Sequence, residues 1–119
     1  MEITKEKIIK GGEFITRKTL SDEIFTPEDF SEEQKMMRDA VKDFTDKEIW
    51  SKKHEFETHN YQLTADVMKK AGNLGFLGVN VPEEYGGLGM PFTSSMLVCD
   101  YISGSSGSTS TAFGAHTGI

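Results

Sequence analysis

Residues 81–90 read Val81-Pro82-Glu83-Glu84-Tyr85-Gly86-Gly87-Leu88-Gly89-Met90 and follow a segment that is patterned as a helix. That segment ends in Lys69-Lys70-Ala71-Gly72-Asn73-Leu74-Gly75-Phe76-Leu77-Gly78. Gly75 occupies the position at which a glycine in the left-handed conformation commonly ends an α-helix. We therefore expect a helix that stops at Gly75, then an apolar extended run (Phe76, Leu77, Val79, Val81) up to Pro82, then a sharp turn at the glycine pair.

The helix before Gly75 has one apolar face. Lys69 and Lys70 lie near its C-terminal end, where positive charge suits the helix dipole. Gly72 lies inside it at a cost of about 1 kcal/mol relative to alanine, and close approach of another backbone would explain the glycine. The apolar positions recur every three or four residues and predict a buried stripe: Leu63, Val67, Ala71 and Leu74.

A longer helix is predicted from about Glu32 to about Lys52. Thr26-Pro27-Glu28-Asp29 has the form of a helix start, and Ser31-Glu32-Glu33-Gln34 restarts the pattern as a capping box. The apolar face then repeats at helical spacing through Met37, Ala40, Val41 and Phe44. We expect Trp50 and the methionines to belong to the core.

A third helix is expected after Pro91, with Thr93 or Ser94 as its cap. Residues 103–111 are so rich in serine and glycine that composition alone predicts a flexible linker. Residues 112–119 then resemble a helix of small residues. The segment 1–25 is weakly patterned: a short helix of Ile3, Ile8 and Ile9 would be broken by Gly11-Gly12, and residues 13–16 would be extended.

These elements predict an all-α fold, a helical bundle, with residues 1–25 as an ordered peripheral arm and residues 26–119 as one domain that is incomplete at its C-terminal end. A chain of 119 residues has room for one modest core. Its formal net charge of −6 argues against a nucleic-acid partner. No apolar run approaches the ~20 residues of a membrane span, and the charged N-terminus has no apolar signal segment behind it. We therefore expect a cytoplasmic protein.

Charge is distributed unevenly along the chain. Every lysine and arginine lies at or before Lys70, and ten of the twelve glycines lie between Gly72 and Gly118. Residues 71–119 carry only three acids, Glu83, Glu84 and Asp100. This uncharged portion is typical of a segment that other protein or a ligand covers.

The residue types that carry chemistry do not form a recognisable centre. Glu83 and Glu84 are adjacent and would not converge on one substrate, and the nearby glycines lack the spacing of a nucleotide loop. The three histidines are too scattered for a metal site, and no metal is predicted. His116 is more typical of a packed core histidine than of a catalytic one. Cys99, the one cysteine, has no partner for a disulfide and is expected to act as a small buried apolar side chain.

The order of three blocks nevertheless resembles the acyl-CoA dehydrogenases. Residues 30–39 resemble the first long helix of that family. Residues 69–90 are the most specific block, and residues 110–119 resemble the start of a helix that lines the acyl pocket. The likeness runs from about Phe25 to the last residue. Residues 103–111 depart from it, because the family usually has a charged, leucine-rich helix there; either the helix ends are arranged differently or the segment is loosely ordered.

The resemblance implies the N-terminal part of a three-part enzyme, with a β-barrel domain and a C-terminal helical domain to follow. Such an enzyme binds FAD and a fatty acyl-CoA and removes a proton from the α-carbon and a hydride from the β-carbon. It passes electrons to an electron-transfer flavoprotein and forms a homodimer or homotetramer. The catalytic base would lie in the C-terminal domain, so no catalytic or flavin-binding residue is assigned to this chain, and the isolated chain is expected to be inactive.

The resemblance does place part of the acyl pocket. Some relatives with short substrates carry a bulky side chain where this chain has Gly114, and the wording Gly114-Ala115-His116 resembles that of long-chain enzymes. We therefore expect medium-to-long acyl chains. The residues at or near positions that face the acyl chain are Ser110, Thr111, Gly114, Ala115 and Gly118.

Two other functions remain open from the sequence. The chain could be a non-catalytic helical interaction module that binds a partner through its charge-poor second half. It could also be an acyl-chain carrier without redox chemistry, although a closed pocket is doubtful in so short a chain.

Overall fold

The computed structural model describes residues 8–118, and no β-strand occurs among them. The all-α prediction is confirmed. The chain divides into two compact units, Met1–Glu32 and Glu33–Ile119. Ile3 lies outside the described residues. The predicted division into an arm of residues 1–25 and a domain of residues 26–119 stays a prediction.

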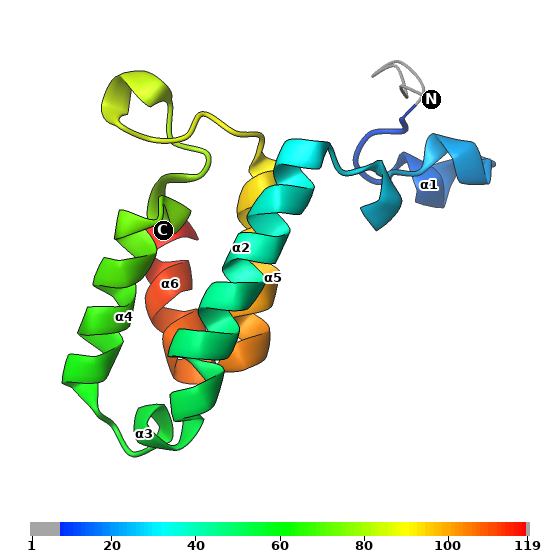
Figure 1. The fold of residues 1–119 in the computed structure, drawn as a ribbon. Helices are drawn as coiled ribbons and strands as arrows, with labels where there is room; N and C mark the ends of the chain where they lie inside the picture. Colours follow the sequence, from blue (N-terminus) through cyan, green and yellow to red (C-terminus); the bar gives the residue numbers. More distant parts are fainter. Residues whose placement is uncertain (1–7, 119) are drawn as a thin grey trace. The chain divides into compact units, whose positions relative to one another are not determined.

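Unit 1 contains short helical turns rather than a long helix (Figure 1). The prediction of an extended segment at residues 13–16 is wrong, because Gly11 turns the chain with a φ of +55° and the amide of Ile15 then donates to the carbonyl of Gly12 at 2.9 Å. Ile8 and Ile9 are not helical. The predicted start at Thr26 begins a single turn, where the Thr26 amide donates to the Asp29 carboxylate at 2.8 Å. The turns are α1 (Glu13–Thr16), η1 (Ser21–Glu23) and η2 (Pro27–Asp29).

Unit 2 is a bundle of four longer helices, α2 (Glu32–Glu48), α4 (Tyr61–Asn73), α5 (Phe92–Ser105) and α6 (Gly107–Gly118). Gln34 of α2 donates hydrogen bonds to the start of α5, and in Figure 1 α6 lies between α4 and α5. The loop that follows α4 extends away from the helices before the chain returns into α5.

The core of the bundle draws on every α-helix of unit 2. Phe44 of α2 meets Phe76 edge to face, with ring centroids 5.5 Å apart. Ala40 is exposed, although the helical pattern placed it on the apolar face. The buried cluster consists of Val41, Phe44, Ile49, Phe56, Val67, Ala71, Phe76, Val79, Val98, Ile102 and Phe113.

The first long helix is shorter than predicted. α2 ends at Glu48, and η3 (Trp50–Lys52) and α3 (Lys53–Glu57) follow. This break lets Ile49 and Phe56 both point into the core while Trp50 stays 56% exposed. The expectation that Trp50 is a core residue is therefore wrong; its ring lies 5.0 Å from the ammonium of Lys53. Among the methionines, Met36 and Met96 are also exposed, at 74% and 47%.

The helix stop at Gly75 is confirmed by its φ of +84°. Val67 and Ala71 are buried as predicted, but Leu74 is 57% exposed. The crowding at Gly72 comes from a side chain rather than a backbone, because a Cβ built there would lie 3.3 Å from Cδ1 of Leu77. Residues 76–81 are not extended: after Gly75 they wind into η4 (Phe76–Gly78).

The loop after η4 is held together by backbone hydrogen bonds. It contains one helical turn, η5 (Glu83–Tyr85). The Leu88 amide donates to the Gly78 carbonyl at 2.9 Å, and the Gly89 amide donates to the Val81 carbonyl at 2.8 Å. These bonds fold residues 78–90 back on themselves, as the glycine pair predicted.

The serine-rich segment is helical, so composition was misleading there. α5 continues to Ser105 and α6 begins at Gly107, with Ser106 alone in extended backbone between them (φ −158°, ψ 131°). Ser105, Ser106 and Thr109 are buried. Burial against the bundle thus overrides the weak helix propensity of serine and glycine. α5 starts at Phe92 after Pro91, and its first turn is not capped by a side chain of Thr93 or Ser94.

Candidate functional site

The five residues predicted to face an acyl chain all lie on α6. Thr111, Ala115 and Gly118 are exposed, whereas Ser110 and Gly114 are half-buried. A helix turns by about 100° per residue, so these five positions occupy one continuous side of α6. The buried residues Thr109 and Phe113 lie on the other side. The structure therefore brings the predicted residues together as one helix face, which we call the α6 face.

The bundle fixes the orientation of this face. The Ser110 amide donates to the Ser106 carbonyl at 2.9 Å, so the helix starts directly after the one-residue connection. Phe113 and Thr109 are each only 1% exposed and anchor α6 beside α4 and α5. The hydroxyl oxygen of Thr109 is buried and has no hydrogen-bond partner among the described residues.

The chemistry of the α6 face is nearly apolar. The Ser110 hydroxyl donates to the Ser103 hydroxyl of α5 at 2.9 Å, and the Thr111 hydroxyl donates to the Gly107 carbonyl at 2.9 Å. Both hydroxyls are thus engaged within the helix pair. A Cβ built on Gly114 or on Gly118 would meet no atom within 4 Å, so open space lies in front of both glycines. The face can accept an apolar ligand closely, but it offers no group for acid–base chemistry.

The other residues considered from the sequence do not form a centre. Glu83 and Glu84 are exposed on η5, and His54 and His59 are exposed on and beside α3. His116 is exposed, so the expectation of a packed histidine is wrong. Cys99 is half-buried, and its sulfur lies 3.7 Å from the Ser103 hydroxyl. Within residues 8–118, no three side chains of metal-ligand type are grouped to hold an ion.

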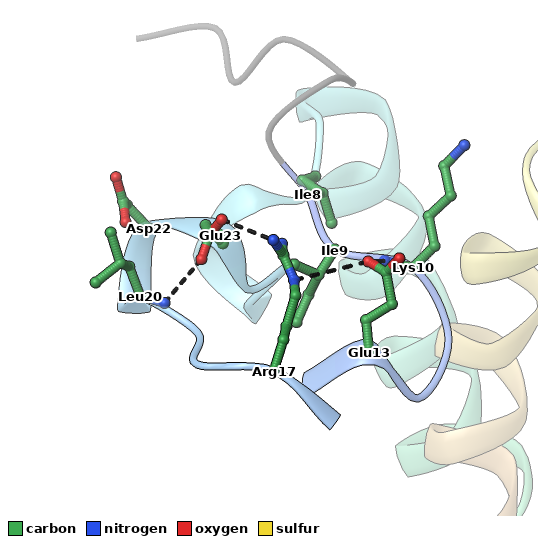
Figure 2. Close-up of a pocket in the computed structure, with 8 residues that line it drawn as sticks. All are labelled: Ile8, Ile9, Lys10, Glu13, Arg17, Leu20, Asp22 and Glu23. Atoms are coloured by element: carbon green, nitrogen blue, oxygen red, sulfur yellow. Dashed lines mark hydrogen bonds and ion pairs between the residues drawn. The ribbon is translucent and has the colours of Figure 1, made fainter. Parts of the chain in front are cut away.

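Two hollows were not anticipated from the sequence. One, of about 340 Å³, lies between α2, η3 and α5 and includes Trp50, Asp46, Asp100 and Tyr101 in its lining. Trp50 was the residue that could have indicated this hollow from the sequence, but it was predicted to lie in the core. The other, of about 500 Å³, lies within unit 1 around Arg17 (Figure 2). The residues of unit 1 show no clear periodicity, so the sequence did not indicate this second hollow.

Glu48 forms two ion pairs in unit 2, one of which joins two α-helices. The Glu48 carboxylate of α2 lies 2.6 Å from the Lys70 ammonium of α4 and 3.1 Å from that of Lys52. Hydrogen bonds from Lys70 and then Lys52 lower the pKa of Glu48 below its ordinary value. This carboxylate ties α2 to α4 through side chains and lines neither of the two hollows.

Comparison with known proteins identifies the family. The model of the family "Acyl-CoA dehydrogenase, N-terminal domain" matches residues 31–119. The chain belongs to the acyl-CoA dehydrogenases. The resemblance found in the sequence is thereby confirmed, and the part of the family that matches is the N-terminal helical domain.

Individual relatives differ in length. A "Probable acyl-CoA dehydrogenase" of Bacillus subtilis is 41% identical over 110 residues, which are 92% of this chain and 18% of that protein. The isovaleryl-CoA dehydrogenase, mitochondrial, of Pongo abelii is 34% identical over 90 residues, which are 75% of this chain and 21% of that protein. The match to the Bacillus subtilis relative contains more residues but makes up a smaller share of that protein. The Bacillus subtilis relative is therefore longer than the Pongo abelii one, by roughly two fifths.

A solved structure matches this chain with an identity and coverage similar to those of the Bacillus subtilis relative. The acyl-CoA dehydrogenase of Bacillus anthracis, crystallised with FAD, is 40% identical and superimposes with a TM-score of 0.83. The match covers 93% of this chain and 19% of that one. This chain therefore spans about a fifth of the length of the relatives that it matches.

The described residues do not by themselves form a flavin site. A dinucleotide cofactor carries a negatively charged diphosphate, and the sequence has no lysine or arginine after Lys70. The N-terminal turn of α6, where free amides can bind an anion, exposes Gly107 and Ser108, but α6 supplies no lysine or arginine beside them. No reaction step is therefore assigned to a flavin on this chain. Separately, none of the helices within residues 8–118 has the length and apolar character of a membrane span.

Proposed function

We propose that this chain is the N-terminal helical part of a flavin-dependent acyl-CoA dehydrogenase. The parent enzyme would convert a fatty acyl-CoA to the trans-2-enoyl-CoA by removing a proton from the α-carbon and a hydride from the β-carbon. The observation that carries the proposal is the family match over residues 31–119, together with 41% identity to a Bacillus relative of that activity class. The relative crystallised with FAD supports the cofactor of the parent.

Within the parent, the α6 face would form one wall of the acyl pocket. Its members in this role are Ser110, Thr111, Gly114, Ala115 and Gly118. Three features support the role: the five positions share one side of the helix, their hydroxyls are already hydrogen-bonded, and the glycines have open space before them. A further contribution would be to shield the flavin, because excluding water strengthens electrostatic interactions and limits side reactions.

We propose medium-to-long acyl chains as substrates. The absence of a side chain at Gly114 would leave depth in the pocket, and each additional buried methylene is worth about 0.8 kcal/mol. The open space in front of Gly114 is consistent with this depth. The remaining features of the parent are likewise proposals: an electron-transfer flavoprotein as electron acceptor, a homodimer or homotetramer, and a cytoplasmic location.

A chimera tests the proposal. This chain would replace the aligned segment of the Bacillus anthracis acyl-CoA dehydrogenase, and the product would be assayed for flavin absorbance and for acyl-CoA oxidation with an electron-accepting dye. We expect the chimera to retain FAD and to turn over, and we expect the isolated chain to do neither. A folded chimera that binds FAD but leaves every acyl-CoA unoxidised would contradict the proposal, as would turnover by the isolated chain.

A second candidate is the non-catalytic interaction module. It is favoured by the large apolar side chains exposed in the charge-poor half, which include Tyr85 at 76%, Phe92 at 64% and Leu74 at 57%. A covered surface is expected under both proposals, so the exposure does not separate them. The chimera does, because a module that has lost the enzymatic role would not support turnover in an enzyme framework.

A further inference from the structure

Unit 1 exposes an unusual concentration of apolar side chains. Phe14 is 58% exposed, Ile15 77% and Leu20 58%. Ile24 and Phe25 are exposed as well. These five exposed side chains all lie within residues 14–25, and large exposed apolar surface marks interaction sites. From here on, the arm means residues 8–25, the described part of the predicted arm of residues 1–25. We call these five side chains its apolar surface.

The arm is not a loose tail, because polar contacts close it into a loop. The Ile9 amide donates to the Glu23 carbonyl at 3.0 Å, which joins the start of the loop to its end. The Leu20 amide donates to the Glu23 carboxylate at 2.8 Å. Arg17 lies between two carboxylates, 3.1 Å from that of Glu23 and 3.9 Å from that of Glu13 (Figure 2).

Charged and apolar side chains of the arm lie together around the hollow of Figure 2. Arg17 forms its ion pairs there, and Leu20 lines the same hollow. Phe14 and Ile15 are not part of this lining and remain exposed. Burying apolar surface is the main favourable contribution to folding, so a locally ordered loop of this kind is suited to lie against another protein surface.

The matches to relatives fall into two groups by their length. A match over 110 of the 119 residues must include most of the arm, and such matches are 18% and 19% of the proteins concerned. We call these proteins the long relatives. Matches that cover about three quarters of this chain are about as long as the family segment, residues 31–119, and make up 21% to 23% of their proteins. We call these proteins the short relatives.

The length of the long relatives indicates what the arm lies against. Each longer match is a smaller share of its protein, so the long relatives exceed the short relatives in length by roughly a third or more. That excess is larger than the ~50 residues of a small domain. The arm thus accompanies an additional region that is large enough to present a folded surface.

We propose that the apolar surface of the arm docks on this additional region of the long acyl-CoA dehydrogenases. The inference rests on the proposed function, because it requires that this chain be part of such an enzyme. The arm would then be an adaptor between the N-terminal helical domain and the region that the short relatives lack. That additional region would present a complementary apolar surface to the arm.

Photo-crosslinking in the chimera with the Bacillus anthracis enzyme tests the docking. Benzoylphenylalanine would be placed at Ile15, and separately at Lys18 as a control at an exposed polar position of the same arm. After irradiation, mass spectrometry would identify the linked peptides. We expect the probe at Ile15 to link to the region without counterpart in the short relatives, with at least tenfold lower yield from Lys18.

Other outcomes would count against the inference. Links from Ile15 to unit 2, to a segment shared with the short relatives, or to nothing would overturn it while the chimera still binds FAD and turns over. A chimera without turnover would instead overturn the proposed function, and the docking inference would fall with it.

A stability measurement gives an independent check. Ile15→Ser should lower the melting temperature of the chimera by about 2 °C or more, yet leave that of the isolated chain unchanged. Tyr61→Ser is the matched control, because Tyr61 is also 77% exposed but lies on α4. Equal effects of Ile15→Ser on the chimera and on the isolated chain would contradict docking.

Discussion

Gly87 packs directly on Val81. A Cβ built on Gly87 would overlap the carbonyl oxygen and the Cβ of Val81, so the turn leaves no space for any side chain. The same carbonyl accepts the amide of Gly89 at 2.8 Å. The glycine pair is therefore required by a backbone that crosses itself closely, and the conformation of the whole loop depends on this contact.

Gly87→Ala should destabilise the chain by about 1–3 kcal/mol, because overpacking forces the backbone of residue 81 to move. Gly104→Ala is the matched control: Gly104 lies in α5 with no atom within 4 Å of a built Cβ. Alanine there should stabilise the helix by about 0.5–1 kcal/mol. Urea unfolding followed by circular dichroism would measure both. Equal effects of the two substitutions would contradict the close packing at Gly87.

Gln34 should couple energetically to Ser94. The buried Gln34 amide group donates to the Ser94 hydroxyl at 3.0 Å and to the Thr93 hydroxyl at 3.1 Å, which joins α2 to α5. Removing one partner leaves a buried polar group short of a bond, at a cost of about 1–3 kcal/mol. Ser94→Ala, Gln34→Leu and the double variant form a cycle, and we expect a coupling of about 0.5 kcal/mol or more. Strict additivity of the two substitutions would argue against the bond.

The stability of the chain should fall in acid through Glu48. Lys70 and Lys52 hold the pKa of Glu48 below its ordinary value, so the folded state binds the proton less readily than the unfolded state does. The stabilisation is therefore present above the ordinary pKa of a glutamate and is lost as the pH falls through the lowered one.

Glu48→Gln should remove this part of the pH dependence and cost about 0.5–1 kcal/mol near neutral pH. Asp43→Asn is the control, because Asp43 and its partner Lys47 are both 72% exposed and their pair should contribute less. Urea midpoints measured from about pH 3 to 7 give the comparison. An unchanged acid limb in the Glu48→Gln chain would refute the assignment.

Gly114→Phe should shift the chimera toward shorter acyl chains. The new side chain would occupy the open space of the α6 face, so each methylene that it excludes should lower kcat/KM by about fourfold, corresponding to about 0.8 kcal/mol. His116→Phe introduces the same ring at an exposed position off that face and should leave the chain-length profile unchanged. A sharp optimum at four carbons before any substitution would contradict the expected depth of the pocket.

Local backbone rules predicted the helix stop at Gly75 but not the crowding at Gly72, which comes from the side chain of Leu77. Gly75 ends α4 as expected because only a residue that tolerates a positive φ fits there. Helical spacing likewise identified Val67 and Ala71 as buried. The side of α6 on which the five proposed pocket residues lie follows from the same periodicity, although their role was implied only by the family resemblance.

Features set by tertiary contacts were predicted poorly. Trp50 was assigned to the core from its apolar character, but the helix breaks at Ile49, which buries Ile49 and leaves the indole outside. Residues 103–111 were predicted as a linker, although burial of Ser105, Ser106 and Thr109 makes them helical. The arm gave no periodic signal, because ion pairs and single backbone bonds rather than a repeating face hold it in shape.

Because a single residue, Ser106, joins α5 to α6, inserting or deleting one residue there would change which side chains line the proposed pocket. An insertion there would rotate α6 by about 100° if its packing axis were kept, and would exchange Thr111 and Gly114 for a different set of side chains. Insertions and deletions at this point should consequently be selected against more strongly than substitutions. Substrate range would then evolve by replacing side chains on α6 while the rotation of the helix about its axis stays the same.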